Sequence, residues 1–156
     1  MEKNKVINQM ELKFKALSIN ESFARASIAG FCLQLNPSLD ELTDIKTAVS
    51  EAVTNSIVHA YPNNKENAEV FASVKLFKNS VQIEIIDSGI GIENLEQAKK
   101  PFYTTKPTTE RSGMGFTVME SFMDSVVVEN NIGGGLKVIL TKEIKEGNLE
   151  KNSQIV

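Results

Sequence analysis

The chain has 156 residues, 41% of them hydrophobic, and a formal net charge of −3 at pH 7. This length and composition predict one globular domain with a hydrophobic core, and the interspersed lysines and glutamates give no basic surface for nucleic acid. The single cysteine, Cys32, and the lack of an apolar leader or a membrane-length apolar run predict a cytoplasmic protein without membrane contact.

The first quarter of the chain predicts a strand and a helix. Residues 10–16 alternate between apolar and charged side chains, which is typical of a half-buried strand. Ser18 and Glu21 have the spacing of a capping box, so a helix is expected to begin there and to end by Asn36-Pro37. The inward face of this helix is predicted to contain Ala24, Ile28, Phe31 and Leu35.

A second capping box, Ser38 with Glu41, opens a longer predicted helix. This helix is expected to stop at Tyr61-Pro62, because the residue before a proline is disfavoured in a helix. Its inward residues are predicted to be Leu42, Ile45, Val49, Ala52, Val53, Ser56 and Ile57.

The second half of the chain predicts two hairpins, separated by a long loop and a helix. The loop contains two prolines and no hydrophobic period, and a loop of this length is usually functional. The expected elements are strands 69–77 and 81–87, a short helix 93–99, the loop 100–112, a helix from Gly115, and strands 125–128 and 136–141.

This order of elements favours an α/β (α+β) two-layer sandwich with the helices on one face of a mixed β-sheet. It disfavours a doubly wound fold, in which strands and helices alternate. Residues 1–142 are predicted to form the domain, and residues 143–156 a polar C-terminal tail that frays.

Three polar residues, Glu51, Asn55 and His59, recur at every fourth position of the second helix and therefore share one face. One interpretation is a solvated helix edge with i,i+4 hydrogen bonds, in which the helix dipole favours His59. The other is a chemical site, because an amide oxygen can bind Mg²⁺ and a carboxylate one turn away can deprotonate a nucleophile.

Two glycine motifs follow. Asp87 ends a predicted buried strand before Gly89 and Gly91; a buried acid needs a partner, and the glycines indicate a close approach of the backbone to another group. Residues 110–116 (ERSGMGF) open a helix, whose free N–H groups favour phosphate. This second motif is neither a Walker A motif nor a dinucleotide fingerprint, because GK[ST] and a third glycine are missing.

The ordered set of motifs resembles the nucleotide-binding domain of the GHKL superfamily (gyrase-type, Hsp90-type, MutL-type and histidine-kinase ATPases), with its Bergerat-type ATP-binding fold. The matching stretches are EAVTN (51–55), DSGIGI (87–92) and SGMGF (112–116). Over residues 8–142 the chain further resembles the anti-sigma F factors of endospore-forming bacteria. Members of that family are small dimeric cytoplasmic proteins that bind ATP with Mg²⁺, sequester a sporulation sigma factor and phosphorylate a serine of an anti-anti-sigma protein.

The resemblance implies a role for each matched residue. Asp87 would accept a hydrogen bond from the 6-amino group of adenine, which would be the missing partner of the acid, and Gly89 and Gly91 would let the backbone pass close to the nucleotide. Asn55 would coordinate Mg²⁺, and Glu51 would act as the general base toward the partner's serine. The remaining nucleotide-binding residues would be Thr104, Thr105 and Lys106 in the loop, Arg111 at the γ-phosphate, and Ser112, Gly113, Met114 and Gly115 at the phosphates.

Three further positions are less determined by the resemblance. His59 matches a family position, but the phospho-acceptor of histidine kinases lies in a separate segment, so phosphorylation of His59 is not expected. Arg25 is either a solvated residue or a partner contact. Gly135-Leu136 stands where many superfamily members carry Gly-Thr, so a water-mediated contact to adenine is absent or is supplied elsewhere.

The implied function is an anti-sigma factor that is also a protein serine kinase and forms a homodimer. A nucleotide-gated binding module without phosphotransfer is the alternative, in which ATP only orders the loop 100–112. An ATPase part of a larger machine is disfavoured, because no further domain is expected after residue 142.

Overall fold

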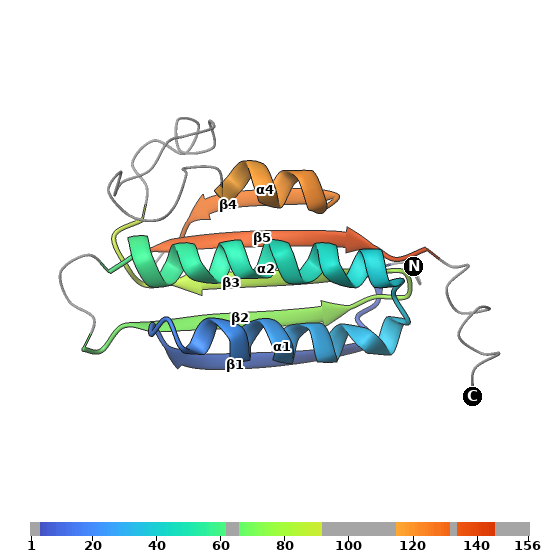
Figure 1. Cartoon of the computed structure of the whole chain (residues 1–156), viewed down its shortest axis with the longest axis horizontal. Coiled ribbons are helices and arrows are strands. Elements are labelled where there is room, and N and C mark those ends of the chain that lie inside the picture. Colours follow the sequence, from blue (N-terminus) through green and yellow to red (C-terminus); the bar gives the residue numbers. More distant parts are fainter. Residues whose placement is uncertain (1–3, 62–65, 92–114, 132–133, 146–156) are drawn as a thin grey trace.

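The computed structural model describes residues 4–61, 66–91, 115–131 and 134–145. In this part of the chain, five strands form one sheet in the order β1-β2-β3-β5-β4, and the helices cover one of its faces (Figure 1). No helix within it is long and apolar enough to cross a membrane. The elements are β1 (Asn8–Lys15), α1 (Asn20–Cys32), the 3-10 helix η2 (Leu33–Leu35), α2 (Leu39–His59), β2 (Glu69–Leu76), β3 (Ser80–Asp87), α4 (Gly115–Phe122), β4 (Ser125–Asn130) and β5 (Leu136–Glu143).

The predicted two-layer arrangement is confirmed, but the sheet is not mixed. All neighbouring strands in the described sheet are antiparallel. The helix pair α1 and α2 returns the chain to the end of the sheet where β1 stops, so β2 runs opposite to β1 (Figure 1). The connection through α4 makes β4 run in the same direction as β3, but β5 lies between these two strands and keeps them from pairing.

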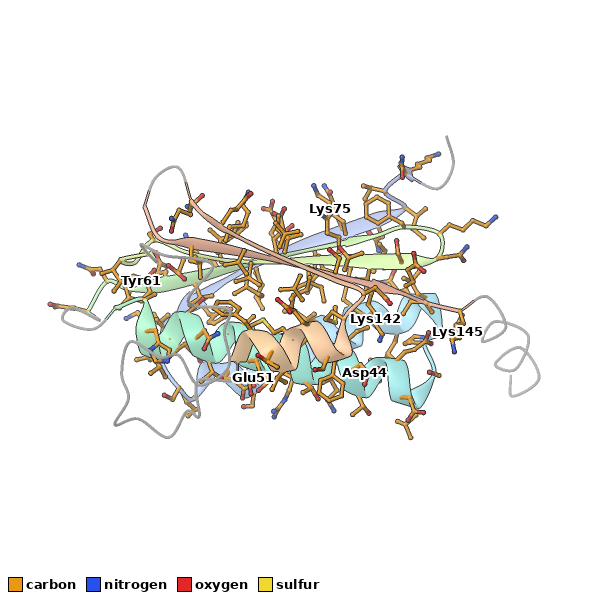
Figure 2. All side chains as sticks on the ribbon, turned by 90° about the horizontal axis from the view of Figure 1, so that it is seen from above. Asp44, Glu51, Tyr61, Lys75, Lys142 and Lys145 are labelled. Carbon is orange, nitrogen blue, oxygen red and sulfur yellow. The ribbon has the colours of Figure 1, made fainter. Side chains whose placement is uncertain are left out.

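The core lies between the sheet and the helices. In β3 every second residue from Val81 to Asp87 is buried, and the residues between them are half-buried. Figure 2 shows the helices on one side of the sheet, with Lys75 of β2 projecting from the other side. The predicted inward residues of α1, η2 and α2 are buried, except Phe31 and Leu42, which are half-buried.

Helix α2 begins with the predicted capping box. The Ser38 hydroxyl oxygen accepts the N–H of Glu41 at 3.1 Å, and the Glu41 carboxylate accepts the N–H of Ser38 at 2.8 Å. The capping box predicted at Ser18 is wrong, because Ile19 is the N-cap of α1, has helical backbone angles, and makes no side-chain capping bond.

The C-terminal boundary of the domain lies beyond residue 142. β5 continues to Glu143, Ile144 is buried, and the N–H of Lys145 donates to Glu41 Oε2 at 3.0 Å. Residues 143–145 therefore belong to the folded domain and not to a frayed tail. The expectations that lie outside the described residues concern the short helix 93–99, the loop 100–112 and the tail 146–156.

Candidate functional site

The carboxylate of Asp87 is the centre of the candidate site. It lies at the end of β3 and is only 3% exposed. Its Oδ2 accepts the Ser56 hydroxyl at 3.1 Å, and its Oδ1 accepts the backbone N–H groups of Gly89 and Leu136, each at 3.1 Å. Burial raises the pKa of Asp87 above its ordinary value of 3.8, while these donors act in the opposite direction. The protein thus stabilises an ionised form that burial disfavours.

Among the residues that the structure describes, three donors contact this carboxylate, and one acceptor position has none. An ionised carboxylate has about four acceptor positions, two on each oxygen. The described residues fill both positions on Oδ1 and one on Oδ2. The idea that Asp87 lacks a partner until adenine binds is therefore wrong, since protein groups already hold the acid. The contact to adenine itself stays a prediction, and it would use the fourth position, on Oδ2.

The loop after β3 is joined to the C-terminal end of α2. The N–H of Ile90 donates to the Ala60 carbonyl at 2.9 Å, and the N–H of Ser88 donates to the Tyr61 hydroxyl at 2.8 Å. That hydroxyl donates in turn to the carbonyl of Glu69, at the start of β2, at 2.7 Å. Figure 2 shows Tyr61 at this end of the sheet. These bonds hold the loop that follows the acid in one position relative to α2.

Glycines near the acid are required by contacts within the protein. A Cβ on Gly89 would overlap the carbonyl of Ala60, and a Cβ on Gly135 would overlap the carbonyl oxygen of Asp87. Gly135 and Gly91 also have φ of +90° and +70°, in the left-handed region that favours glycine. The close approach predicted at Gly89 and Gly91 is thus explained by protein packing, and their approach to a nucleotide stays a prediction.

The polar stripe of α2 lies next to the acid. Glu51, Asn55 and His59 are half-buried on one face of the helix, as their spacing predicts. Asn55 adjoins Ser56, whose hydroxyl binds the acid. α2 packs along α4, which begins at Gly115, and Figure 2 shows Glu51 on the part of α2 beside α4. The structure therefore brings together the E-x-x-x-N motif, the acid and the helix that follows the second glycine motif.

Arg25, the predicted partner contact, lies on α1. Its Nη1 is 3.5 Å from Glu21 Oε1, one helical turn earlier, and its side chain is 38% exposed. The side chain thus stays partly accessible beside Glu21, and its role toward a partner stays a prediction. The predicted site residues outside the described part of the chain are Thr104, Thr105, Lys106, Arg111, Ser112, Gly113 and Met114.

Sequence reasoning missed two residues of this site. Ser56 was expected only as an inward residue of α2 and Tyr61 only as a helix stop, whereas both hydroxyls contact the segment at Asp87. A signal for Ser56 exists: it is a hydroxyl on a face with Val53 and Ile57, and a buried hydroxyl needs a hydrogen-bond partner. Tyr61 gives no such signal, because its partners are backbone groups, the carbonyl of Glu69 and the N–H of Ser88, which side-chain patterns do not reveal.

Comparison with known proteins matches residues 15–142 to the family described as Histidine kinase-like ATPase domain. The anti-sigma F factor of Geobacillus sp. (strain WCH70) is 56% identical over 137 residues, which cover 88% of this chain and 93% of that protein. The anti-sigma F factor of Priestia megaterium is 54% identical over 88% of this chain and 93% of its own length. That of Clostridium beijerinckii is 52% identical over 87% of this chain and 94% of its own.

Two solved structures share the fold at low sequence identity. The RsbU and RsbW domains of Rv1364c from Mycobacterium tuberculosis align with a TM-score of 0.64 and 17% identity, over 88% of this chain and 32% of that chain. The nucleotide-free catalytic domain of the histidine kinase ThkA aligns with a TM-score of 0.55 and 17% identity, over 88% of this chain and 99% of that chain. At such identities the likeness concerns the fold alone.

Proposed function

The chain belongs to the anti-sigma F factors, within the histidine kinase-like ATPase family, and we propose that it is an ATP-dependent protein serine kinase. In this proposal it sequesters a sporulation sigma factor and phosphorylates an anti-anti-sigma protein on serine. The observation that carries the nucleotide part is the open acceptor position on the buried carboxylate of Asp87. The name shared by the relatives supports the part that concerns the sigma factor.

The site fits adenine through this single open acceptor. The 6-amino group of adenine is a donor, and only a donor can use the fourth position on ionised Asp87. The start of α4 at Gly115 supports phosphate binding, because the N–H groups of a helix N-terminus are free and carry positive partial charge. The further contacts to ribose and phosphates are proposed for Thr104, Thr105, Lys106, Arg111, Ser112, Gly113 and Met114.

Mg²⁺ fits this site only together with phosphate oxygens. Within the described part of the chain, no group of three or more His, Cys, Asp and Glu side chains could hold a metal ion. We assign one protein ligand to Asn55, since Mg²⁺ in nucleotide sites takes few protein ligands and several from phosphate and water. When bound, the ion supplies charge neutralisation on the transferring phosphoryl group.

Phosphotransfer to a protein requires a base beside the nucleophile. We assign this role to Glu51, one helical turn before Asn55. Glu51 accepts the proton of the partner's serine hydroxyl, the serine oxygen forms a bond to the γ-phosphorus, and the bond from that phosphorus to the ADP oxygen breaks. The products are ADP, phosphoserine and the proton carried by Glu51.

The test uses γ-labelled ATP with Mg²⁺, the purified chain and the anti-anti-sigma protein of the same organism. We expect label on a serine of the second protein, and loss of this label in Glu51→Ala while ATP binding persists. Glu11→Ala is the matched control, because Glu11 is an exposed glutamate on β1. If Glu51→Ala still releases the sigma factor in ATP and the wild type labels no protein, the chain is a nucleotide-gated binding module instead.

The partner and dimer contacts are proposed on the side of the molecule that carries α1. Ile19, Phe23 and Leu33 are large apolar side chains that α1 and η2 leave exposed, and Arg25 is accessible beside them in sequence. Exposed apolar groups and arginine are enriched at interfaces.

Two measurements test these contacts. Light scattering should give about twice the chain mass of 17.2 kDa, and Arg25→Glu should weaken sigma-factor binding without changing ATP affinity. A monomeric mass would overturn the dimer, and unchanged sigma-factor affinity would overturn the role of Arg25.

A further inference from the structure

Ser56 is a polar residue at a place where α2 is otherwise apolar. It is 3% exposed and shares the inward face of the helix with Val53 and Ile57. A hydroxyl is disfavoured in such surroundings unless it forms a hydrogen bond. The bond that Ser56 forms goes to Asp87 Oδ2, at 3.1 Å. Burial of this serine is therefore tied to the acid of the candidate site.

The three donors to Asp87 divide into two kinds. Oδ1 is held by the backbone N–H groups of Gly89 and Leu136, which are not side-chain donors. Oδ2 is held by the side chain of Ser56 alone among the described residues. The open acceptor position is also on Oδ2. Oδ2, the oxygen that would bind the ligand, is therefore also the oxygen that accepts the Ser56 hydroxyl, and a substitution of Ser56 removes this donor.

The charge state of Asp87 decides which ligand group this oxygen accepts. An ionised carboxylate only accepts hydrogen bonds, whereas a protonated one also donates. Burial favours the protonated form of Asp87, and each donor favours the ionised form. A 6-amino purine offers a donor and suits the ionised acid, whereas a 6-oxo purine offers an acceptor and suits the protonated acid.

We propose that Ser56 is a specificity-determining residue: its bond to Oδ2 keeps Asp87 an acceptor and so makes the site select 6-amino over 6-oxo purine nucleotides. The inference rests on the proposed ATP site. It goes further by assigning the discrimination to a side chain on α2, which acts through Asp87 as a positioning residue. No contact of Ser56 with the nucleotide is needed.

The experiment measures the affinities of ATP and inosine triphosphate, with Mg²⁺, by calorimetry. The two nucleotides differ at C6, where an oxo group replaces the amino group, and at N1, which carries a hydrogen only in the 6-oxo base. Ser56→Ala should lower the ratio of the ATP affinity to the inosine triphosphate affinity by roughly ten- to hundredfold. This is the factor expected for one hydrogen bond to a charged group. Ser56→Cys, close in volume and with a weak thiol donor, should give an intermediate ratio.

Thr47→Ala is the matched control, because the Thr47 hydroxyl also lies on α2 but bonds to the Thr43 carbonyl. It should leave the ratio unchanged. If Ser56→Ala weakens both nucleotides by the same factor, or changes neither, Ser56 has only a structural role and the inference is overturned. If the wild type binds neither nucleotide, the proposed ATP site itself is wrong, an outcome that is distinct from an unchanged ratio.

Discussion

Replacing Asp87 with asparagine separates the binding role of this residue from its structural role. The amide oxygen of the variant can still accept the N–H groups of Gly89 and Leu136. The amide nitrogen can donate to the oxygen of the Ser56 hydroxyl, which reverses the direction of that bond. Because all three contacts persist, we expect the free energy of unfolding to change by no more than about 1 kcal/mol.

ATP binding should weaken far more than the fold. In Asp87→Asn the open acceptor position becomes an N–H donor that faces the 6-amino donor of adenine. Loss of a hydrogen bond to a charged group costs about 1.5–3 kcal/mol, and a buried donor without a partner costs about 1–3 kcal/mol more. Together these effects predict binding weaker by roughly two to four powers of ten.

Calorimetric titration with ATP and Mg²⁺, together with urea unfolding, measures both quantities. Asp124→Asn is the matched control, because Asp124 Oδ2 also accepts a backbone N–H, that of Glu143 at 2.7 Å, but at an exposed position. It should leave ATP affinity unchanged. An Asp87→Asn variant that is folded and binds ATP as the wild type does would refute the assignment of the base-binding group.

The same variant reports the ionisation of Asp87. The folded-state pKa of Asp87 is raised above the ordinary value of 3.8, so the folded protein binds this proton more tightly than the unfolded chain does. The stability from this group is fully present below pH 3.8 and is lost as the pH rises through the folded pKa. The unfolding free energy of wild type minus that of Asp87→Asn should fall over this window. A difference that grows with pH would contradict the burial argument.

Three shorter predictions concern the surroundings of the site and the core. Gly135→Ala should lower the free energy of unfolding, measured in urea, by at least about 2 kcal/mol, because φ is +90° and the new Cβ meets the carbonyl oxygen of Asp87. Unchanged stability would contradict the requirement for glycine at this position. Glu41→Ala should lower the free energy of unfolding by about 2–4 kcal/mol and Ser38→Ala by only about 1 kcal/mol, because the Glu41 carboxylate accepts two backbone N–H groups. Equal losses of stability in the two variants would contradict the role of the second bond. Cys32, whose pKa burial raises to about 12, should react with a thiol reagent only after unfolding, which absorbance of the released product measures.

The start of α2 is predictable from the sequence and the start of α1 is not, although both have Ser-x-x-Glu spacing. Ser38 has an extended backbone, with φ −65° and ψ 164°, which lets its side chain reach the N–H of Glu41. Before α1, Ile19 already has helical angles, and the side chain of Asn20 donates to the Lys15 carbonyl. The way the chain leaves β1 therefore decides where α1 begins, and residue spacing does not encode it.

The local sequence predicts each strand, but it does not predict which strands pair with each other in the sheet. Alternation from Val81 to Asp87 predicts β3, and the short connection to β2 predicts the hairpin between them. The pairing of β3 with β5, in which Ile85 lies opposite Val138, joins segments with no local signal for each other. The insertion of β5 between β3 and β4 makes the described sheet antiparallel throughout. Local sequence patterns do not predict this strand order.

The acid shows where reasoning about the site from sequence succeeds and where it stops. Its place at the end of an apolar strand indicates that Asp87 must have partners. Two of these partners are backbone N–H groups, and side-chain patterns cannot reveal a backbone donor. The N–H of Leu136 binds the acid whatever its side chain is, so Gly135-Leu136 in place of Gly-Thr leaves this bond intact. Burial of Asp87 is therefore accounted for by the protein alone, and the property that points to a ligand is the unfilled position on Oδ2 beside Ser56.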